Sequence, residues 1–395
     1  MVQVAVTDLS AYFDDEITAM PNLVTVGAAN TLTTVAGIPF YTGDSGSIYT
    51  HDVSGTDSTA TANTAFGITA MDAITTGDNN SAFGNAALGA NTSGGNNTAV
   101  GYEALQSNTT AGNNTALGRG SLQNNTTGAS NVAVGFEALN ANTTGTRNIA
   151  IGQNAYNSSD TENDNLAIGH DAMTTNTAGG EKNVAVGNYA LDALTAGDQN
   201  VAVGYDALGV LSTGEKNTAV GANSMQLHTT GNNNTAVGES SMDSNTTGAS
   251  NVAIGQEAMN ANTTGAENTV IGRNALAANT TTSSNTAVGA NALTANTASE
   301  NTAIGYNAAA ANTTGVRIIA IGKGAYDASD TENDNIAIGF NAMTTNTAGG
   351  TKNVALGNYA LDALTSGDSN VMIGHNAGTA TTTAYQSVGV GENAL

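Results

Sequence analysis

The 395-residue sequence contains no cysteine and no tryptophan, and it has only two prolines. Without cysteine the chain has no disulfide framework, no thiolate metal site and no cysteine nucleophile. Aromatic residues make up only 4% of the chain, so large core side chains are scarce and a conventional large globular core is not expected. Stability must therefore come from the packing of small residues and from hydrogen bonds.

Basic residues are scarce as well. Eight Lys and Arg stand against 32 Asp and Glu, which gives a formal net charge of -24, and the first basic residue is Arg119. This balance disfavours nucleic acid and anionic lipid as partners. The start of the chain has no basic residue of the kind that opens a signal peptide, and no apolar run approaches the length of a membrane span. We therefore expect no nucleic-acid partner, no membrane insertion and no Sec export.

One short phrase dominates what is present. It reads NTAVGYEAL at residues 97–105, NVAVGFEAL at 131–139 and NVAVGYDAL at 200–208. The glycine of this phrase recurs from Gly67 to Gly391, and 16 of the 19 intervals between successive copies are 17 residues. DTENDN at residues 160–165 returns at 330–335, ten repeats later. A period this constant is typical of a solenoid, and the longer echo indicates block duplication.

The consensus repeat is N-T-A-V-G-x-x-A-L-x-x-N-T-T-G-x-x, whose residues we number as positions 1 to 17. Position 4 is Val, Ile, Leu or Phe in every copy, and position 9 is Leu, Met or Tyr except at Ala309 and Gly378. These two positions are the predicted apolar core of each coil. Eight residues represent this prediction: Val100, Leu105, Val134, Leu139, Val203, Leu208, Ile254 and Met259.

Glycine and the NTTG segment recur too often for helices, so short strands fit the repeat better. We predict one strand at NTAVG and a second at xxAL, with corners at Gly and NTTG, where left-handed conformations are readily adopted. The fold class is then all-β: a parallel β-solenoid of about twenty 17-residue coils over residues 61–395, with ladders of Val/Ile, Leu/Met and Asn. At the spacing of neighbouring strands such a rod is on the order of 95 Å long.

Two large apolar side chains per coil contribute roughly 3 to 6 kcal/mol, whereas ordering 17 residues costs about 25 kcal/mol at roughly 1.5 kcal/mol per residue. Hydrogen bonds between stacked coils reduce the difference between this ordering cost and the gain from burial. Side-by-side chains would add a shared core, and small residues would let their backbones approach closely. We therefore expect a parallel homo-oligomer.

The repeated S/T/N-V-A-I-G phrase with its following Ala resembles the head repeats of trimeric autotransporter adhesins. The resemblance covers residues 61–395 and implies a left-handed parallel β-roll that forms a homotrimer. The unit of 17 residues is longer than that family's, and the chain shows neither its signal peptide nor its stalk and membrane anchor. Similar Asn-Thr-Ala-Val-Gly arrays also resemble fibre and appendage proteins of bacterial viruses, which need no export signal.

We therefore expect a non-catalytic structural fibre or decoration protein of a bacteriophage virion that projects from the particle and contacts the host surface through a glycan or protein. The alternative is a trimeric bacterial surface adhesin or extracellular filament subunit at the cell surface. No enzyme is expected and no cofactor is required.

Residues 1–60 have a different composition from the repeats. Leu9, Tyr12, Phe13 and Ile17 have helical spacing before Pro21, and residues 22–50 alternate in a way that favours strands. This segment is predicted to attach the fibre to another virion structural protein, or alternatively to cap the first coil.

Few residues have the type and spacing of a catalytic, metal-binding or phosphate-binding site. None of the histidines, His51, His170, His228 and His375, shows a triad or metal-ligand spacing, and no phosphate-loop motif occurs. Carboxylates at alternate positions of the two DTENDN segments could converge on Ca²⁺, although a solvated acidic corner is the simpler interpretation. These weak metal candidates are Asp160, Glu162, Asp164, Asp330, Glu332 and Asp334.

Position 6 carries an aromatic residue in several coils, and stacking would line these residues up as an outer stripe. The stripe could contact glycans by ring stacking or could simply pack the corner. The candidates for surface contact are Tyr102, Phe136, Tyr205, Tyr306 and Phe340. Threonine rows suggest ice binding less well, because most threonines fall in a corner. The many N-x-T sequons follow from the NTTG corner and are explained by turn formation.

Overall fold

The computed structural model describes residues 25–27, 31–35, 38–39, 48–50, 59–176, 179–346 and 349–395. The helix predicted at Leu9 to Ile17 lies outside these residues. The described part of the chain contains strands and turns and no helix, and it forms a parallel β-solenoid. It divides into two units, Met1–Asn163 and Asp164–Leu395.

The first unit contains a small antiparallel sheet and a parallel ladder. The sheet consists of β1 (Thr25–Gly27), β2 (Thr31–Val35) and β3 (Ile38–Pro39), in that order, which agrees with the strands predicted for this region. Pro39 lies on β3, at the edge of this sheet, where proline is tolerated. The ladder begins at β4 (Ile48–Tyr49), which pairs with β5, so parallel pairing starts before residue 61.

The other strands of the first unit are β5 (Thr64–Phe66), β6 (Ser81–Phe83), β7 (Thr98–Val100), β8 (Thr115–Leu117), β9 (Val132–Val134) and β10 (Ile149–Ile151).

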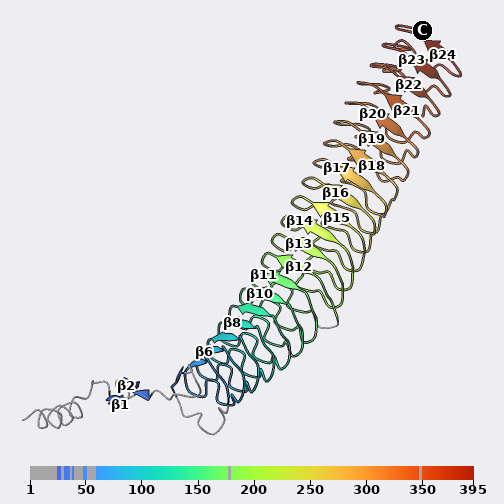
Figure 1. Cartoon of the computed structure of the whole chain (residues 1–395). Coiled ribbons are helices and arrows are strands. Elements are labelled where there is room, and N and C mark those ends of the chain that lie inside the picture. The colour runs from blue at the N-terminus through green and yellow to red at the C-terminus, as the bar shows by residue number, and fades with distance from the viewer. Residues whose placement is uncertain are drawn as a thin grey trace, which may run out of the picture. The chain divides into compact units, whose positions relative to one another are not determined.

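The second unit is a ladder of parallel strands in which each strand pairs with the next one along the chain (Figure 1). Its strands are β11 (Leu166–Ile168), β12 (Val184–Val186), β13 (Val201–Val203), β14 (Thr218–Val220), β15 (Thr235–Val237), β16 (Val252–Ile254), β17 (Thr269–Ile271), β18 (Thr286–Val288), β19 (Thr302–Ile304), β20 (Ile319–Ile321), β21 (Ile336–Ile338), β22 (Val354–Leu356), β23 (Val371–Ile373) and β24 (Val388–Val390). Equivalent residues pair directly, as Ala202 does with Ala219, so every repeat position forms a column. The predicted ladders are confirmed. Because β5 to β24 mark nineteen successive turns, the coil number is close to the expected twenty.

Each coil has one strand and not two. The predicted second strand at xxAL is wrong, because positions 7 and 9 adopt left-handed backbone angles, as at Glu103 (φ 57°) and Leu105 (φ 52°). Backbone bonding between coils nevertheless continues there. The Glu103 N–H donates to the preceding coil at Asn85 O (2.9 Å), and the Leu105 N–H donates to the next coil at Ser121 O (3.0 Å). Alternating directions of donation satisfy the backbone without extended chain.

The glycine at position 5 is required by contact between coils. Gly238 has φ +134°, and a Cβ on it would lie 2.5 Å from the carbonyl oxygen of Gly255 in the next coil. Any side chain here would both strain the backbone and push the coils apart. The alanines at positions 3 and 8, such as Ala236 and Ala258, are buried inside the coil. Close approach at these positions thus occurs within one chain, and the expectation that small residues serve contact between chains is not supported by their placement.

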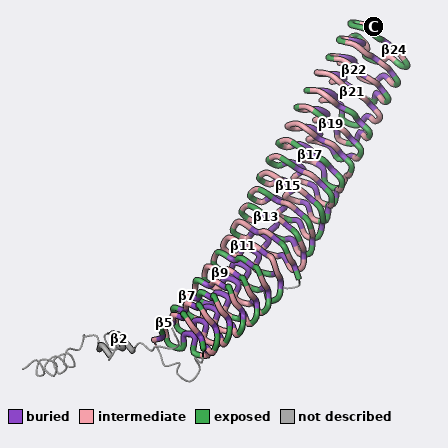
Figure 2. Tube along the Cα trace, in the orientation of Figure 1, coloured by how far each residue is buried: buried purple, intermediate pink, exposed green. Residues whose placement is uncertain are grey.

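The prediction of the core is half right. Leu105, Leu139, Leu208 and Met259 at position 9 are fully buried. Buried, intermediate and exposed segments alternate along the coils (Figure 2). The position 4 residues are only partly covered: Val100 and Val134 are half-buried, and Val203 and Ile254 are 36% and 39% exposed. The reason is the two-residue period of a strand: since the position 3 alanine points inward, positions 2 and 4 must point outward.

Candidate functional site

The outer face of the parallel sheet is uncharged, with an apolar residue at position 4 of every copy of the repeat. Position 4 holds only Val, Ile, Leu or Phe, and position 2 holds only Thr, Ser, Val, Ile or Leu, so neither column contains a charge or an amide. In the second unit Ile271 and Ile304 are each 40% exposed, and in the first unit Phe66 and Phe83 are 48% and 43% exposed. Such a continuous uncharged strip is unusual on a chain with a net charge of -24.

The predicted asparagine ladders lie in the interior of the coils, a burial that the sequence analysis did not predict. At position 1, Asn234 is fully buried, its Oδ1 accepts the Asn251 N–H (3.0 Å), and its Nδ2 donates across the coil to Gly248 O (2.8 Å). Other asparagines of this column form the same two bonds: the side-chain oxygen accepts the N–H of the next asparagine, and the side-chain amide donates to the position 15 carbonyl of its own coil. Position 12 forms a second buried column, in which Asn262 Nδ2 donates to Asn245 Oδ1 (2.8 Å). The sequence signal for the two columns is the frequent recurrence of Asn before the strand and in NTTG.

Asparagines of the N-x-T sequons belong to these buried columns. Asn108, in the sequon with Thr110, is fully buried and donates to Asn91 Oδ1 and Ala111 O, both at 3.0 Å. Thr109 Oγ1 donates to Thr126 O of the next coil (3.2 Å). The structural role predicted for these residues is confirmed.

The aromatic residues at position 6 form rows along the coils. In the first unit the Arg119 guanidinium carbon lies 5.8 Å from the Tyr102 ring centroid and 5.4 Å from that of Phe136. Tyr102 is 47% exposed and Phe136 39%. Glu103, through a hydrogen bond and its charge, raises the pKa of the Tyr102 hydroxyl. The first row is therefore a solvent-facing aromatic, cation, aromatic sandwich beside a carboxylate.

The second unit has a longer row. Lys323 Nζ lies 6.0 Å from the Tyr306 ring and 5.8 Å from the Phe340 ring. Tyr359 continues the row at 5.3 Å from Phe340 and 6.1 Å from His375, with edge-to-face packing at both contacts. We call these five residues, in five successive coils, the long aromatic row. A separate group in the same unit joins Tyr205 to Tyr189 (5.8 Å) and Tyr189 to His170 (5.5 Å).

The carboxylates of the DTENDN segments do not converge. In the second segment Asp330 is exposed, whereas Glu332 is only 3% exposed and its oxygens accept the N–H groups of Thr331 (3.1 Å) and Gly349 (3.0 Å). Asp334 binds Arg317 through two hydrogen bonds, of 2.5 Å from Nε and 3.0 Å from Nη2, and this contact lowers the pKa of the Asp334 carboxyl.

The first segment follows the same pattern where it lies in the first unit. Asp160 is exposed, and Glu162 is 2% exposed and accepts the Ser159 hydroxyl (3.0 Å) and the N–H groups of Asp160 and Thr161 (both 3.1 Å). Asp164 is half-buried and belongs to the second unit. Across the described residues no group of three or more His, Cys, Asp or Glu side chains could hold a metal ion. The glutamates act as internal caps for a corner, a role the sequence analysis missed.

His228 occupies the interior asparagine column at position 12. It is fully buried, its Nε2 lies 2.8 Å from Gly231 O and its Nδ1 lies 2.9 Å from Asn245 Nδ2. These contacts fit a neutral ring that donates from Nε2 and accepts at Nδ1. Burial lowers the pKa of His228. His170 and His375 sit in the aromatic groups at the surface, and His51 lies outside the described residues.

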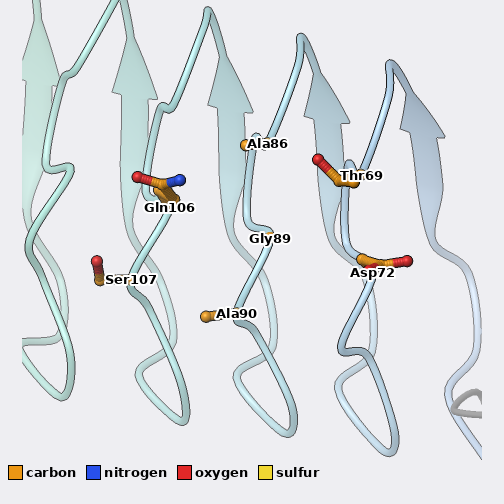
Figure 3. Close-up of a pocket in the computed structure, with 7 residues that line it drawn as sticks. All are labelled: Thr69, Asp72, Ala86, Gly89, Ala90, Gln106 and Ser107. Atoms are coloured by element: carbon orange, nitrogen blue, oxygen red, sulfur yellow. The ribbon is translucent and has the colours of Figure 1, made fainter.

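A shallow pocket of about 380 Å³ lies on the polar side of the first unit (Figure 3). Its lining residues are Thr69, Asp72, Ala86, Gly89, Ala90, Gln106 and Ser107. It exists because the middle coil carries Ala86, Gly89 and Ala90 where the flanking coils carry longer polar side chains. The Asp72 carboxylate points away from Gly89 in Figure 3. The pocket is therefore a gap in a surface column, without a convergent set of polar groups.

Within the part of the chain that the structure describes, no helix is long and apolar enough to cross a membrane. No protein-family model matches the sequence, and no curated protein matches it either. The features that bear on function are therefore the outer face of the sheet, the interior asparagine columns and the aromatic rows.

Proposed function

We propose that the chain is a non-catalytic structural fibre or decoration protein of a bacteriophage virion, built as a homotrimer of left-handed β-rolls. Residues 1–60 attach it to another virion structural protein, and the solenoid projects from the particle and contacts the host surface. The observation that carries the proposal is the uncharged apolar face formed by positions 2 and 4.

The uniformity of this face favours a partner of the same kind. Other outward positions vary freely, since position 6 alone holds Ala222, Glu239, Gln256 and Arg273 in four successive coils. A globular partner would need an apolar surface on a few coils only. A second copy of the chain has the same rise per coil, so it can meet every position 4 side chain in the same way.

The energetics require many coils to act together. Covering the remaining 40% of an Ile such as Ile271 gains about 0.6 to 1.2 kcal/mol. Association costs about 4 to 15 kcal/mol in lost freedom of motion. A single coil cannot meet this cost, whereas the fourteen strands of the second unit together can. This requirement explains why position 4 is apolar in every copy.

Two measurements test the proposal. Light scattering coupled to size-exclusion chromatography gives the mass of the purified chain, and three times 39.1 kDa is expected; a monomer would remove the homotrimer. Immunogold electron microscopy of the producing culture, scored for label on virions against intact cells, tests the location. Gold on particles supports the virion fibre, whereas gold on cells with bare particles refutes it and favours the bacterial surface adhesin.

A further inference from the structure

The long aromatic row of the second unit has the composition of a sugar-binding surface. Tyr306 is 49% exposed, Lys323 and His375 are exposed, and Phe340 and Tyr359 are half-buried. Edge-to-face contacts hold the last three rings in place, so little side-chain freedom remains to be lost when a ligand binds.

Amides occupy position 7 beside two rings of this row. Position 7 next to Tyr306 is Asn307 and next to Phe340 is Asn341, and both are half-buried. No Asp or Glu occurs at position 6 or 7 anywhere from Arg273 to Asn376. Amide groups both donate and accept hydrogen bonds, which suits the hydroxyl groups of a sugar.

The acidic groups closest in sequence to the row are Asp327 and Asp362 at position 10. Burial raises the pKa of each of these carboxyls. The row thus carries aromatic rings, amides and at most two cationic groups within a chain whose net charge is -24.

The first unit provides an internal comparison. Its sandwich of Tyr102, Arg119 and Phe136 has the same aromatic, cation, aromatic order, but position 7 there is Glu103 and Glu137 instead of two asparagines. Position 7 is hydrogen-bonded within the chain in both rows, since Glu103 accepts the Gln123 amide at 2.8 Å and Asn307 accepts the Asn291 amide at 3.1 Å. Carboxylates only accept hydrogen bonds and repel acidic sugars, so this shorter row is the poorer surface for a glycan.

From these contrasts we infer that the long aromatic row binds a neutral linear polysaccharide that runs along the coils, with successive sugar rings against successive side chains. Centroid separations of 5.3 and 6.1 Å along the row are of the same order as the length of one sugar ring. The inference rests on the proposed function in one respect, because it specifies the host-surface contact assigned there to the fibre. A neutral polysaccharide is expected because the row has no pair of adjacent cationic groups and because the overall negative charge of the chain repels polyanions.

Native affinity electrophoresis tests the inference with the whole chain. The probes in the gel are laminarin, dextran and galactomannan as neutral polysaccharides, and alginate as the anionic one. Retardation is expected with at least one neutral probe and not with alginate. Retardation by none of them, or by alginate alone, would overturn the inference.

A matched pair of variants locates the site. The double change Tyr306→Ala and Phe340→Ala is expected to weaken retardation at least about tenfold, which corresponds to about 1.4 kcal/mol. The control double change Tyr102→Ala and Phe136→Ala, which removes the equivalent rings of the first unit, is expected to leave retardation unchanged. An equal loss in both variants, or a loss only in the control, would refute the assignment.

Circular dichroism and melting temperature of both variants verify that folding is retained. If the rings of the long row prove necessary for folding, Lys323→Ala and Asn341→Ala provide a second, smaller perturbation of the same surface and are expected to weaken retardation. The outcome is separable from the proposed function, because particle labelling and oligomer mass do not depend on sugar binding.

Discussion

The interior and the exterior of a single strand in the second unit reverse the usual distribution of polarity. In the coil that contains β15, the fully buried Asn234 opens the strand and the apolar Val237 closes it on the outer face. The asparagine is inside because every one of its polar atoms has a partner in its own or a neighbouring coil. The valine is outside because the alternation of the strand leaves it no other direction. The comparison teaches that an asparagine whose hydrogen bonds are satisfied can share the interior of this narrow coil with apolar residues such as Met259, while apolar residues of the strand lie outside.

The largest effect is expected from breaking the interior column with Asn234→Leu. The change leaves the buried Asn251 N–H without its partner, which costs about 1 to 3 kcal/mol. It also removes one of the two hydrogen bonds that the Gly248 carbonyl accepts, since the bond from Asn245 Nδ2 remains. We expect a clear fall in melting temperature and faster hydrogen exchange in β15 and β16. The chain itself supplies a control at Ile318, where an apolar residue already occupies position 1: Ile318→Asn is expected to be neutral or stabilising. A wild-type melting temperature for Asn234→Leu would show that the column is not needed.

The exterior column is tested by placing charges on it. Changing Val203, Val220 and Val237 together to Lys puts three like charges on the outer face, where they cannot be buried between chains. We expect the oligomer to dissociate in light scattering while the circular dichroism spectrum of the monomer is retained.

The matched control changes Ala222, Glu239 and Gln256 to Lys at position 6 of the same region. This variant is expected to remain oligomeric. Dissociation of both variants, or of neither, would contradict the assignment of the apolar face as the interface.

A smaller, pH-dependent effect is expected at His228 in the interior asparagine column. Burial lowers the pKa of His228 below its ordinary value of 6.5, so the unfolded chain binds the proton more readily than the folded chain. Its stabilising contribution is therefore complete above pH 6.5 and is lost as the pH falls below that value, by up to about 1.4 kcal/mol per pH unit.

His228→Asn installs the residue that most coils have at this position. The variant is expected to lose less stability than wild type between pH 7.5 and pH 5, as measured by melting temperature. The surface carboxylates are common to both proteins and cancel in the difference. Identical pH profiles would show that the pKa of His228 is the same in the folded and the unfolded chain, and would contradict the lowering of that pKa by burial.

The smallest effect is expected at the solvated edge of the coil. Arg317→Gln removes the ion pair with Asp334, but both side chains lie in solvent, where such pairs contribute little. The melting temperature should hardly change, whereas the pKa of Asp334, followed by NMR, should rise towards 3.8. A fall in melting temperature as large as that of Asn234→Leu would overturn the view that the interior, not the charged edge, holds the coils together.

Periodicity made the architecture predictable, because a 17-residue unit with glycine at position 5 can only be repeated by stacking coils. The burial of position 9 followed from the same reasoning, as at Leu105 and Met259. The position 4 prediction failed because a hydropathy pattern cannot show which side of a strand faces inward. The second strand was predicted wrongly because left-handed angles at residues such as Glu103 and Leu105 are uncommon outside glycine and asparagine and leave no compositional trace.

The candidate functional surfaces were also only partly predictable from the sequence. The aromatic stripe at Tyr102, Phe136, Tyr306 and Phe340 could be read from the sequence because a fixed period places equivalent residues in one column. The sequence did not show that Lys323 lies between two of its rings or that Tyr359 and His375 extend it. Likewise, the spacing of the DTENDN carboxylates suggested convergence, whereas a corner turns Glu332 inward and leaves Asp334 facing Arg317.

The sequence by itself determined the repeat, the parallel stacking and the columns, because these depend only on period and on where glycine allows a bend. Tertiary structure alone decided which columns are inside. That choice depends on cross-coil hydrogen bonds, such as the one from Asn234 Nδ2 to Gly248 O, between residues that meet only after a full turn has closed. Once the asparagines occupy the interior, the branched residues of position 4 must face outward, where they form the surface on which the proposed assembly depends.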